Sequence, residues 1–588
     1  MVKKWTDWLE ARTGYRAILH EALDEHIPGG ARWRYVFGSA LTSTFLIQAV
    51  TGLFLMTSYS PSSSTAWGSV YYISHDLVGG WFLRGLHHFG AQAMVVLLVL
   101  HLLQVLVAGA YRAPREINWW FGMALLFLTL GFSLTGYLLP WDQKGYWATK
   151  VATNIAGNTP LVGSYIQRIV LGGPEYGNQT LTRFYGLHVG VLPTLLVLCL
   201  AAHVALFRKH GVTAPKRSKK PDGSFWPEQF FMDAVASAAV LGVIIVLVLR
   251  EGGANLDAPA DPASGDYPAR PEWYFLSLFQ LLKLPFFAGE REVIGTMVVP
   301  GAIVTVLLLL PLFDKVFPRG LAHFLACALV FGVVGGAAYF TLDAVRDDAR
   351  NAQFQEARRK ADRARDRALR LAAEGIPPDG AAYLLLRDPL HRGAAILEAK
   401  CLGCHAFGGH RTGKPVLSAA DLKGYGTRDW ARRLLENPDT PEFFGVLRKC
   451  DASLAGMRTW KRGSKATARE LDHLADFLAA MAAAPIDTPP AVWLEAHGKD
   501  PGAALFETHC ATCHGLGEAG AEGPNVYGWG SLSYFRRMVR DPGADDLYGF
   551  VPKSCRMPSF ADELTDDDLE ALHRYLRADY VDAPAAGR

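Results

Sequence analysis

The sequence predicts an all-α protein in two parts, a bundle of seven transmembrane helices followed by two small helical domains. Seven apolar stretches of about twenty residues, enough to cross a hydrocarbon core of roughly 30 Å, lie in the first 345 of 588 residues. The remainder is more polar and carries the motif CxxCH twice, inside a sequence that repeats itself. Hydrophobic side chains make up 50% of the chain, which is too apolar for an ordinary soluble protein of this length.

The apolar stretches also predict how the chain lies in the membrane. They run over 35–56, 88–108, 118–139, 184–207, 231–249, 294–313 and 321–342. Lysine and arginine gather before the first stretch and after the second, fourth and sixth, so the positive-inside rule places the N-terminus in the cytoplasm. An odd number of spans then places everything after Asp343 on the outer side. Residues 1–34 are polar, and we expect no signal peptide there.

Two of the predicted helices carry histidines at nearly equal spacings. His87 and His101 are fourteen residues apart, about 21 Å along a helix and within roughly 40° of one face. His188 and His203 are fifteen residues apart. In antiparallel helices His87 would pair with His188 and His101 with His203, each pair holding a haem iron. The alternative is four buried histidines bonded to backbone, but ionisable groups at bilayer depth are costly and mostly functional. His88 lies outside the pattern and is predicted to be ordinary.

Glycines repeat at the same interval in the first and third stretches. Gly38 and Gly52 are fourteen residues apart, as are Gly122 and Gly136. Small residues also favour ordinary helix packing in membranes. Because the interval equals that of the first histidine pair, we predict that these glycines give clearance to two flat macrocycles.

With these features, the first 345 residues resemble cytochrome b of the bc-type quinol-oxidising complexes. The resemblance also rests on three motifs, GYLLPWDQKGYWATK at 136–150, TLTRFYGLH at 180–188 and PEWY at 271–274. The fifteen-residue spacing of His188 and His203 and the segment PWDQKGYWA at 140–148 are similar to the chloroplast and cyanobacterial branch of the family. That branch attaches an extra haem through a cysteine where this chain has Val36, so we expect no extra haem.

The resemblance implies an outer site that oxidises quinol. Glu272 is the one carboxylate of PEWY and would accept a proton, with a pKa raised by a hydrophobic pocket. A role for Glu272 as a helix cap or as the partner of Arg270 is the alternative. Tyr274 is the companion residue in the family. Arg84 and Arg183 lie where they could pair with the propionates of the outer haem.

The resemblance also implies an inner site that reduces quinone. The segment FWPEQFFMD at 225–233 is similar to the family segment that bears a quinone-site aspartate, and it points to Asp233. Relatives of the mitochondrial type have a histidine where this chain has Arg208, with His210 nearby. The other contacts of the inner quinone therefore stay open.

The second part begins with a charged stretch and two haem-attachment motifs. Residues 346–388 are rich in Arg, Ala and Asp and predict a helical linker with a solvated face rather than a nucleic-acid site. A CxxCH motif attaches a c-type haem through two thioethers, and its histidine ligates the iron. A lone CxxC would also suit a redox or zinc site, but two complete boxes favour haem. The boxes comprise Cys401, Cys404 and His405, and Cys510, Cys513 and His514.

An internal repeat predicts the second iron ligands. The matching segments are 424–438 with 527–542, and 470–480 with 568–578. A distal ligand should recur in both copies, as Met457 and Met557 do after the first matched segment. Met538 aligns with Leu434 and is predicted to belong to the core. Cys450 and Cys555 precede the two methionines, and whether they pair in a disulfide stays open.

The remaining cysteines, Cys199 and Cys327, lie in membrane spans and are predicted to pack. The expected domains are a four-helix cytochrome b domain, a three-helix domain with PEWY, a linker and two cytochrome c domains. Their ranges are 1–215, 216–345, 346–388, 389–485 and 498–582.

The two parts together predict a fused cytochrome b and di-haem cytochrome c subunit of a bacterial quinol:cytochrome c oxidoreductase in the inner membrane. The expected cofactors are two non-covalent haems b, two covalent haems c, and quinol and quinone. One electron would cross through the b haems to quinone, and the other would leave through the c haems to a downstream cytochrome c or terminal oxidase, with proton translocation. The alternative is a non-catalytic di-haem anchor that connects another dehydrogenase to the c haems.

The resemblance implies partners as well. Outside the haem boxes, the outer-side cysteines have no CxH or CxxC context that would hold an iron–sulfur cluster. We therefore expect a separate Rieske protein that docks near Pro271–Tyr274, and a homodimeric complex in contact with the quinone pool.

Overall fold

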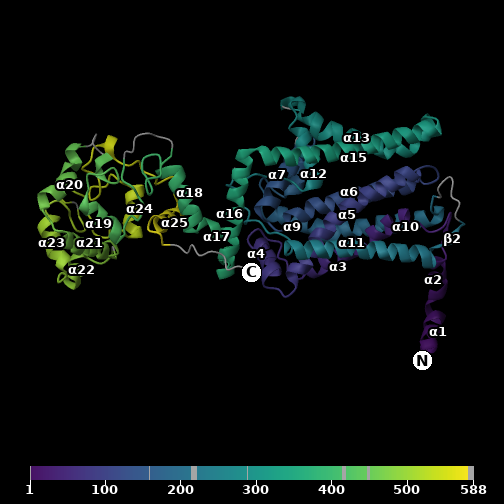
Figure 1. Ribbon diagram of the computed structural model, residues 1–588, viewed down its shortest axis with the longest axis horizontal. Helices are drawn as coiled ribbons and strands as arrows, with labels where there is room; N and C mark the ends of the chain where they lie inside the picture. Colours follow the sequence, from purple (N-terminus) through teal and green to yellow (C-terminus); the bar gives the residue numbers. More distant parts are fainter. Residues whose placement is uncertain are drawn as a thin grey trace. The chain divides into compact units, whose positions relative to one another are not determined.

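The computed structural model describes residues 2–579 except 158, 214–220, 266, 288, 413–418, 447–450, 486 and 519. The chain forms two compact units, Met1–Ala382 and Tyr383–Arg588, and both are built almost entirely of helices (Figure 1). The predicted all-α class is correct.

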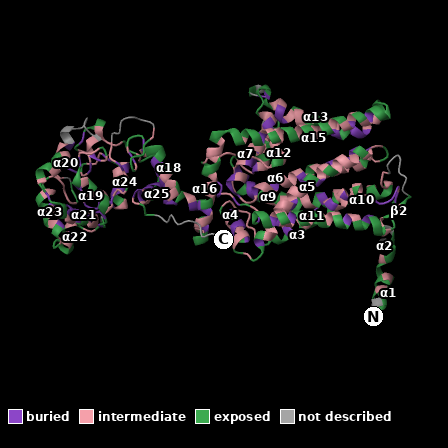
Figure 2. Ribbon diagram, viewed as in Figure 1, coloured by how far each residue is buried: buried purple, intermediate pink, exposed green. Residues whose placement is uncertain are grey.

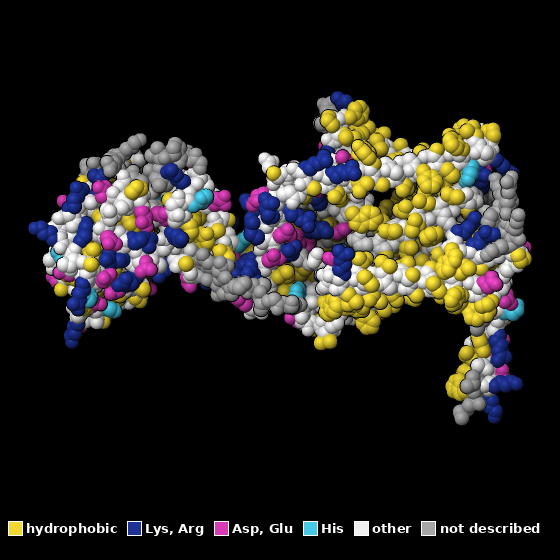
Figure 3. Space-filling view, in the orientation of Figure 1, with side chains coloured by type: hydrophobic (Ala, Val, Ile, Leu, Met, Phe, Trp, Pro, Cys, Tyr) yellow, Lys and Arg dark blue, Asp and Glu magenta, His cyan; other side chains and the backbone are white. Residues whose placement is uncertain are grey.

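The first unit contains the predicted membrane spans. Within the described residues, seven helical segments are long and apolar enough to cross a membrane: Trp33–Met56, Gly80–Val107, Glu116–Leu138, Asn178–His210, Phe225–Glu251, Ile294–Val316 and Arg319–Arg350. Large apolar side chains stay exposed along them, and hydrophobic surface covers much of the visible face of this unit (Figure 3). In water such a surface would be unstable, whereas lipid satisfies it.

Four helices form the central bundle. α3 packs on α5, α6 packs on α10, and α5 contacts α6. Their bounds are α3 (Val36–Met56), α5 (Gly80–Ala108), α6 (Glu116–Leu138) and α10 (Leu192–His210). α11 (Phe230–Glu251) packs against α3 and α5, whereas α12 (Trp273–Leu282) packs against α15 (Arg319–Arg350). The remaining helices of this half are α13 (Val299–Leu309) and α14 (Phe313–Val316).

Short helices and loops close one end of the bundle. They are α4 (Ala66–His75), α7 (Gln143–Gly157), α8 (Gly163–Leu171) and α9 (Asn178–Gly186). A buried cluster that includes Leu138, Trp141, Leu181 and Phe184 holds this end together. At the N-terminus lie α1 (Val2–Thr13) and α2 (Tyr15–Leu23), and the two-residue strands β1 (His26–Ile27) and β2 (Gly223–Ser224) pair antiparallel.

The predicted charged linker is helical over α16 (Ala352–Glu374), and ion pairs such as Arg359 with Glu356 line its surface. One stripe of this helix packs within the first unit, and the charged remainder of its surface is exposed or partly exposed. Arg367, Ala368 and Ala372 are buried on one stripe, and small alanines at i and i+4 allow that close approach (Figure 2).

The second unit holds the two CxxCH boxes. Its helices are α17 (Tyr383–Leu386), α18 (Ala394–Ile396), α19 (Arg428–Glu436), α20 (Asp451–Ser464), α21 (Ala468–Ala482), α22 (Pro490–His497), α23 (Pro501–His509), α24 (Leu532–Arg540) and α25 (Asp566–Leu576). Side-chain caps fix several helix starts; Thr467 and Thr565 each form a capping box with an acidic residue three positions on.

Candidate functional site

The four predicted histidines meet in two pairs inside the central bundle. The ring centroids of His87 and His188 are 6.3 Å apart, and those of His101 and His203 are 6.5 Å apart. We call them the outer and the inner pair, after the membrane sides predicted for them. Two imidazoles that bind one metal ion through bonds of about 2.0–2.1 Å have ring centres roughly 6 Å apart. Each pair therefore has room for one iron ion between its rings.

A π-helical turn explains why the two helices have different histidine spacings. It covers Leu187–Val191 and includes His188, whereas α5 is a regular α-helix from Gly80 to Ala108. A π turn takes one extra residue into a helix, and such turns are frequent at functional sites. The fifteen-residue spacing thus brings His188 and His203 into register with partners that are fourteen residues apart.

Each of the four predicted glycines faces a histidine ring. A Cβ atom on Gly136 would lie 2.6 Å from Cε1 of His188, and one on Gly52 would lie 3.1 Å from Cε1 of the other outer histidine. At the inner pair, a Cβ atom on Gly122 would lie 3.4 Å from Cε1 of His203, and one on Gly38 would lie 3.6 Å from Cε1 of His101. Favourable carbon–carbon contacts lie at about 3.5–4.0 Å. The need for glycine is therefore greatest at the outer pair.

Hydrogen bonds to Nδ1 orient three of the four rings, whereas Nδ1 of His101 is buried without a hydrogen-bond partner. At the outer pair, Oγ1 of Thr51 and Oγ1 of Thr135 lie 3.0 and 3.1 Å from the two Nδ1 atoms. At the inner pair, Nδ1 of His203 lies 3.0 Å from the carbonyl oxygen of Asn118. These contacts use Nδ1 and leave Nε2 to ligate a metal, as outer hydrogen bonds do for histidine ligands generally. The donor set therefore fits bis-histidine haem.

The other predicted haem contacts have protein partners of their own. Arg84 donates to two carbonyls in the loop after α11, at 2.7 and 2.8 Å, and Arg183 donates to the carbonyl of Ile169. A propionate would be an additional partner of either guanidinium. Val36 is buried as the first residue of α3 and has no thiol that could form a thioether.

The PEWY motif lies on a cavity of about 190 Å³. Most of the lining is apolar and comes from α6, α7 and α12, with Ser133, Tyr137 and Tyr274 among its polar side chains. Ser133 and Tyr137 flank Gly136, which touches the outer histidine pair, so the cavity is adjacent to that pair. Burial raises the pKa of Tyr274 to about 12, and this hydroxyl is therefore neutral at physiological pH.

Glu272 has a partner that the sequence did not suggest. Its Oε1 is 2.9 Å from Nζ of Lys144, and its Oε2 accepts a hydrogen bond of 3.3 Å from Gln92. Although Glu272 is the N-cap residue of α12, its side chain makes no capping bond. Arg270 instead holds Asp348 through two hydrogen bonds of 2.6 and 2.8 Å. Neither sequence alternative for Glu272 matches these contacts.

The charge on Lys144 changes the electrostatics expected for Glu272. Burial by itself would raise the pKa of this carboxyl, but the charge and hydrogen bond of Lys144, helped by His88 and Gln92, hold the pKa below its usual value. The predicted raised pKa was therefore wrong. His88, predicted to be ordinary, belongs to this cluster. Lys144 belongs to the motif GYLLPWDQKGYWATK at 136–150, and its place in that motif was the one sequence feature that could have indicated its role.

At the other end of the bundle, Asp233 is buried near the start of α11. It accepts hydrogen bonds of 2.6 Å from Ser39 and 2.8 Å from Gln229. Arg208, which stands where some relatives have a histidine, lies 3.9 Å from a carboxylate oxygen of Glu25. Asp233 is thus anchored by protein groups.

In the second unit, both CxxCH boxes line one cavity of about 1210 Å³. Nδ1 of His405 lies 2.7 Å from the carbonyl of Ala420, and Nδ1 of His514 lies 3.0 Å from that of Pro524, so Nε2 is again left for iron. Burial lowers the pKa of both histidines, which keeps the neutral form that binds metals. The cavity also contains Cys401, Cys404, Cys510, Cys513, Met457, Met538 and Met557. The donor set fits covalent haem.

Met538 belongs to the core of the second unit, and Cys555 forms a disulfide. Met538 packs against a buried cluster that includes Tyr534 and Trp529, as expected of a core residue. Cys555 is disulfide-bonded, whereas Cys450 lies outside the described residues. The other six cysteines are free, including Cys199 and Cys327 in the membrane spans.

Comparison with known proteins identifies the first unit. The cytochrome b subunit of menaquinol:cytochrome c reductase from Bacillus subtilis (strain 168) is 39% identical over 223 residues, which is 37% of this chain and 100% of that protein. The chain belongs to the cytochrome b family. Cytochrome b6 of Gracilaria tenuistipitata var. liui is 39% identical over 209 residues, covering 36% of this chain and 97% of its own length.

Family models account for both units. The model "Cytochrome b(N-terminal)/b6/petB" matches 92–258, and "Cytochrome b(C-terminal)/b6/petD" matches 259–342. The model "Cytochrome C oxidase, cbb3-type, subunit III" matches 388–478 and again 498–576. Among solved structures, a chain of "Hyperthermophilic respiratory Complex III" has a TM-score of 0.48 at 26% identity, covering 57% of this chain and 99% of that chain.

The chain is therefore a multi-pass membrane cytochrome b with a fused cytochrome c region. It is homologous to the cytochrome b subunit of a menaquinol:cytochrome c reductase, and its two families imply haems of the b and c types.

Proposed function

We propose that this cytochrome b oxidises quinol in the cavity beside PEWY, on the outer side of a bacterial inner membrane. The observation that carries the proposal is the position of Glu272. Its carboxylate reaches an apolar cavity large enough for part of a quinol head group, next to the outer histidine pair. An apolar cavity with a few polar groups is the usual form of a small-molecule site.

The residues of the cavity have distinct proposed roles. Glu272 is held as an anion by Lys144, so it is ready to accept a proton from a quinol hydroxyl. Tyr274 keeps its own proton and can donate a hydrogen bond to a quinol oxygen. Gln92 donates a hydrogen bond to Glu272 from α5 and thereby ties the carboxylate to the helix that carries His87 of the outer pair.

Two routes for electrons are proposed. When bound, two b haems and two c haems supply one-electron acceptors. One route would run across the membrane through the outer and inner histidine pairs toward quinone near Asp233. The CxxCH boxes of the second unit provide the other route, toward a downstream cytochrome c or terminal oxidase. The N-terminus would be cytoplasmic and the second unit outside, which agrees with the positive charge of alternate connections.

The second route needs an acceptor at the outer site. We propose a separate Rieske protein that docks near Pro271–Tyr274, in a homodimeric complex. Removing it from the purified complex should abolish quinol-driven reduction of the c haems while all haems stay bound. Undiminished reduction would mean that the second unit takes electrons from the cavity directly.

The function is tested by Glu272→Gln in the whole complex. We expect loss of quinol-driven c-haem reduction with unchanged haem content, because the amide cannot accept the proton. Glu251→Gln is the matched control, since Glu251 pairs with Arg250 in an exposed position at the end of α11. Full activity in Glu272→Gln would contradict the proposal. No quinol-driven reduction in the unmodified complex would instead favour a non-catalytic anchor.

A further inference from the structure

We propose that the two cytochrome c sites are built by exchange between the two sequence repeats. Box 401–405 is completed by helix α25 and by Met557 of the second repeat. Box 510–514 is completed by α21 and by Met457 of the first repeat. The iron ligands would then be His405 with Met557, and His514 with Met457. The inference rests on covalent haem at both boxes, which haem staining checks independently of quinol oxidation.

The segment that leads into the first box packs along the last helix of the chain. A Cβ atom on Gly393 would lie 2.5 Å from the carbonyl oxygen of Ala571 and 2.6 Å from Cβ of Tyr575, so only glycine allows this crossing. The ring of Phe407, just after the box, stacks on Tyr575 with centroids 5.3 Å apart. Ion pairs reinforce the contact, such as Arg392 with Asp568 at 2.7 Å.

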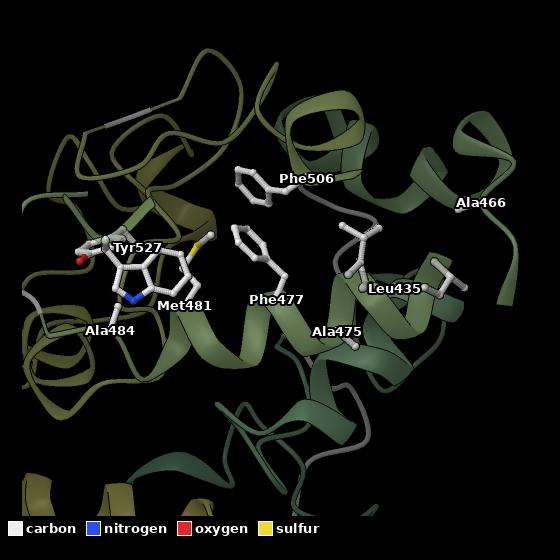
Figure 4. Close-up of a cluster of buried hydrophobic side chains, with 11 residues drawn as sticks. Leu435, Ala466, Ala475, Phe477, Met481, Ala484, Phe506 and Tyr527 are labelled. Carbon is white, nitrogen blue, oxygen red and sulfur yellow. The ribbon is translucent and has the colours of Figure 1, made fainter. Parts of the chain in front are cut away.

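The segment that leads into the second box packs instead on the last helix of the first repeat. A Cβ atom on Gly502 would lie 2.3 Å from the carbonyl oxygen of His473 and 2.5 Å from Cβ of Phe477. Phe506 faces Phe477 in the same buried cluster, with centroids 5.8 Å apart (Figure 4). The cluster therefore combines side chains of both repeats.

The two crossings are equivalent, and this excludes a chance contact. Gly393 and Gly502 each stand eight residues before the first cysteine of their box. When 470–480 is aligned with 568–578, His473 matches Ala571 and Phe477 matches Tyr575. Each repeat thus makes the same helix crossing, but with the partner helix of the other repeat.

Each methionine lies near the haem box of the other repeat. Met557 packs against the core cluster that also receives Cys401 and Leu402. Met457 lies in α20 between two contacts to segments that flank the second box: a Cβ atom on Gly456 would lie 3.9 Å from Oε2 of Glu522, and Nε1 of Trp460 donates a hydrogen bond of 3.0 Å to the carbonyl of His509. Both methionines line the shared cavity.

The ligand assignment can be tested with one haem at a time in the full chain. In Cys510→Ala/Cys513→Ala only the first box keeps a covalent haem. The sulfur-to-iron charge-transfer band of its oxidised form should vanish with Met557→Ala and survive Met457→Ala. In Cys401→Ala/Cys404→Ala the pattern should reverse. The proposal would be overturned if the band of the first box depended on Met457 and that of the second box on Met557. It would also be overturned if neither band depended on either methionine.

A second measurement covers the case in which single-haem chains do not accumulate. A protease site is introduced between the repeats, at Asp487–Thr488, and the intact complex is cleaved under reducing conditions without denaturant. Because each core takes helices from both repeats, the haem-stained fragments should stay together and separate only when denatured. Two fragments that separate under native conditions would overturn the exchange.

Discussion

Replacing Gly136 with alanine should remove the b haem of the outer histidine pair. The new Cβ atom would lie 2.6 Å from Cε1, 3.2 Å from Nδ1 and 3.3 Å from Nε2 of His188. Favourable contacts need about 3.5–4.0 Å, so the imidazole must move by roughly 1 Å. Metal–ligand distances tolerate only about ±0.2 Å. The ring cannot stay at bonding distance from the iron unless α6 itself shifts.

The assay is the ratio of b haem to covalent c haem in purified membranes, because c haem reports how much chain has accumulated. Gly136→Ala should lose one of its b haems. Gly131→Ala is the control on the same helix, since its Cβ atom would meet only Leu192 side-chain atoms at 3.8 Å. An unchanged ratio and spectrum in Gly136→Ala would refute the reasoning.

Three further predictions follow from the same geometry. Lys144→Gln should raise the pKa of Glu272. Since the base works above its pKa, quinol oxidation should fall at about pH 4–5 and be unchanged near pH 8, and equal profiles would contradict this. With Lys144 44% exposed, the ion pair is worth at most about 1 kcal/mol, or roughly 0.7 pH unit. His101→Leu should remove the inner b haem and keep the outer one in spectra, whereas loss of both in a stable protein would argue against the pairing. Replacing both cysteines of each box (Cys401→Ala/Cys404→Ala with Cys510→Ala/Cys513→Ala) should abolish haem staining of the denatured full-length band, and a stained band would reveal a third covalent haem.

The histidine pairs could be predicted because helical geometry is local. Fourteen residues of regular helix return a side chain to nearly the same face, so His87 and His101 had to share a side of α5. The extra residue before His203 was visible in the sequence, but the π turn that absorbs it was not. A π turn depends on how the helix packs, and neighbouring residues do not determine it.

The contacts of Glu272 could not be predicted for a different reason. Lys144 and Glu272 are far apart in sequence and meet only when α7 and the loop before α12 pack on α6. Sequence proximity suggested Arg270, yet that side chain reaches Asp348 at the end of α15. A pKa depends on such neighbours, so burial alone gave the wrong direction for Glu272.

The exchange of halves in the cytochrome c unit has a physical cause in the connection between the repeats. The two repeats present equivalent surfaces, so side-chain pattern alone does not decide whether α21 packs on the first or the second box segment. α21 ends at Ala482 and α23 begins at Pro501, and the short stretch between them includes α22. Helices joined by short connections pack together at the lowest entropic cost. α21 therefore pairs with α23, and the first box segment is left for α25, the remaining helix with a matching surface.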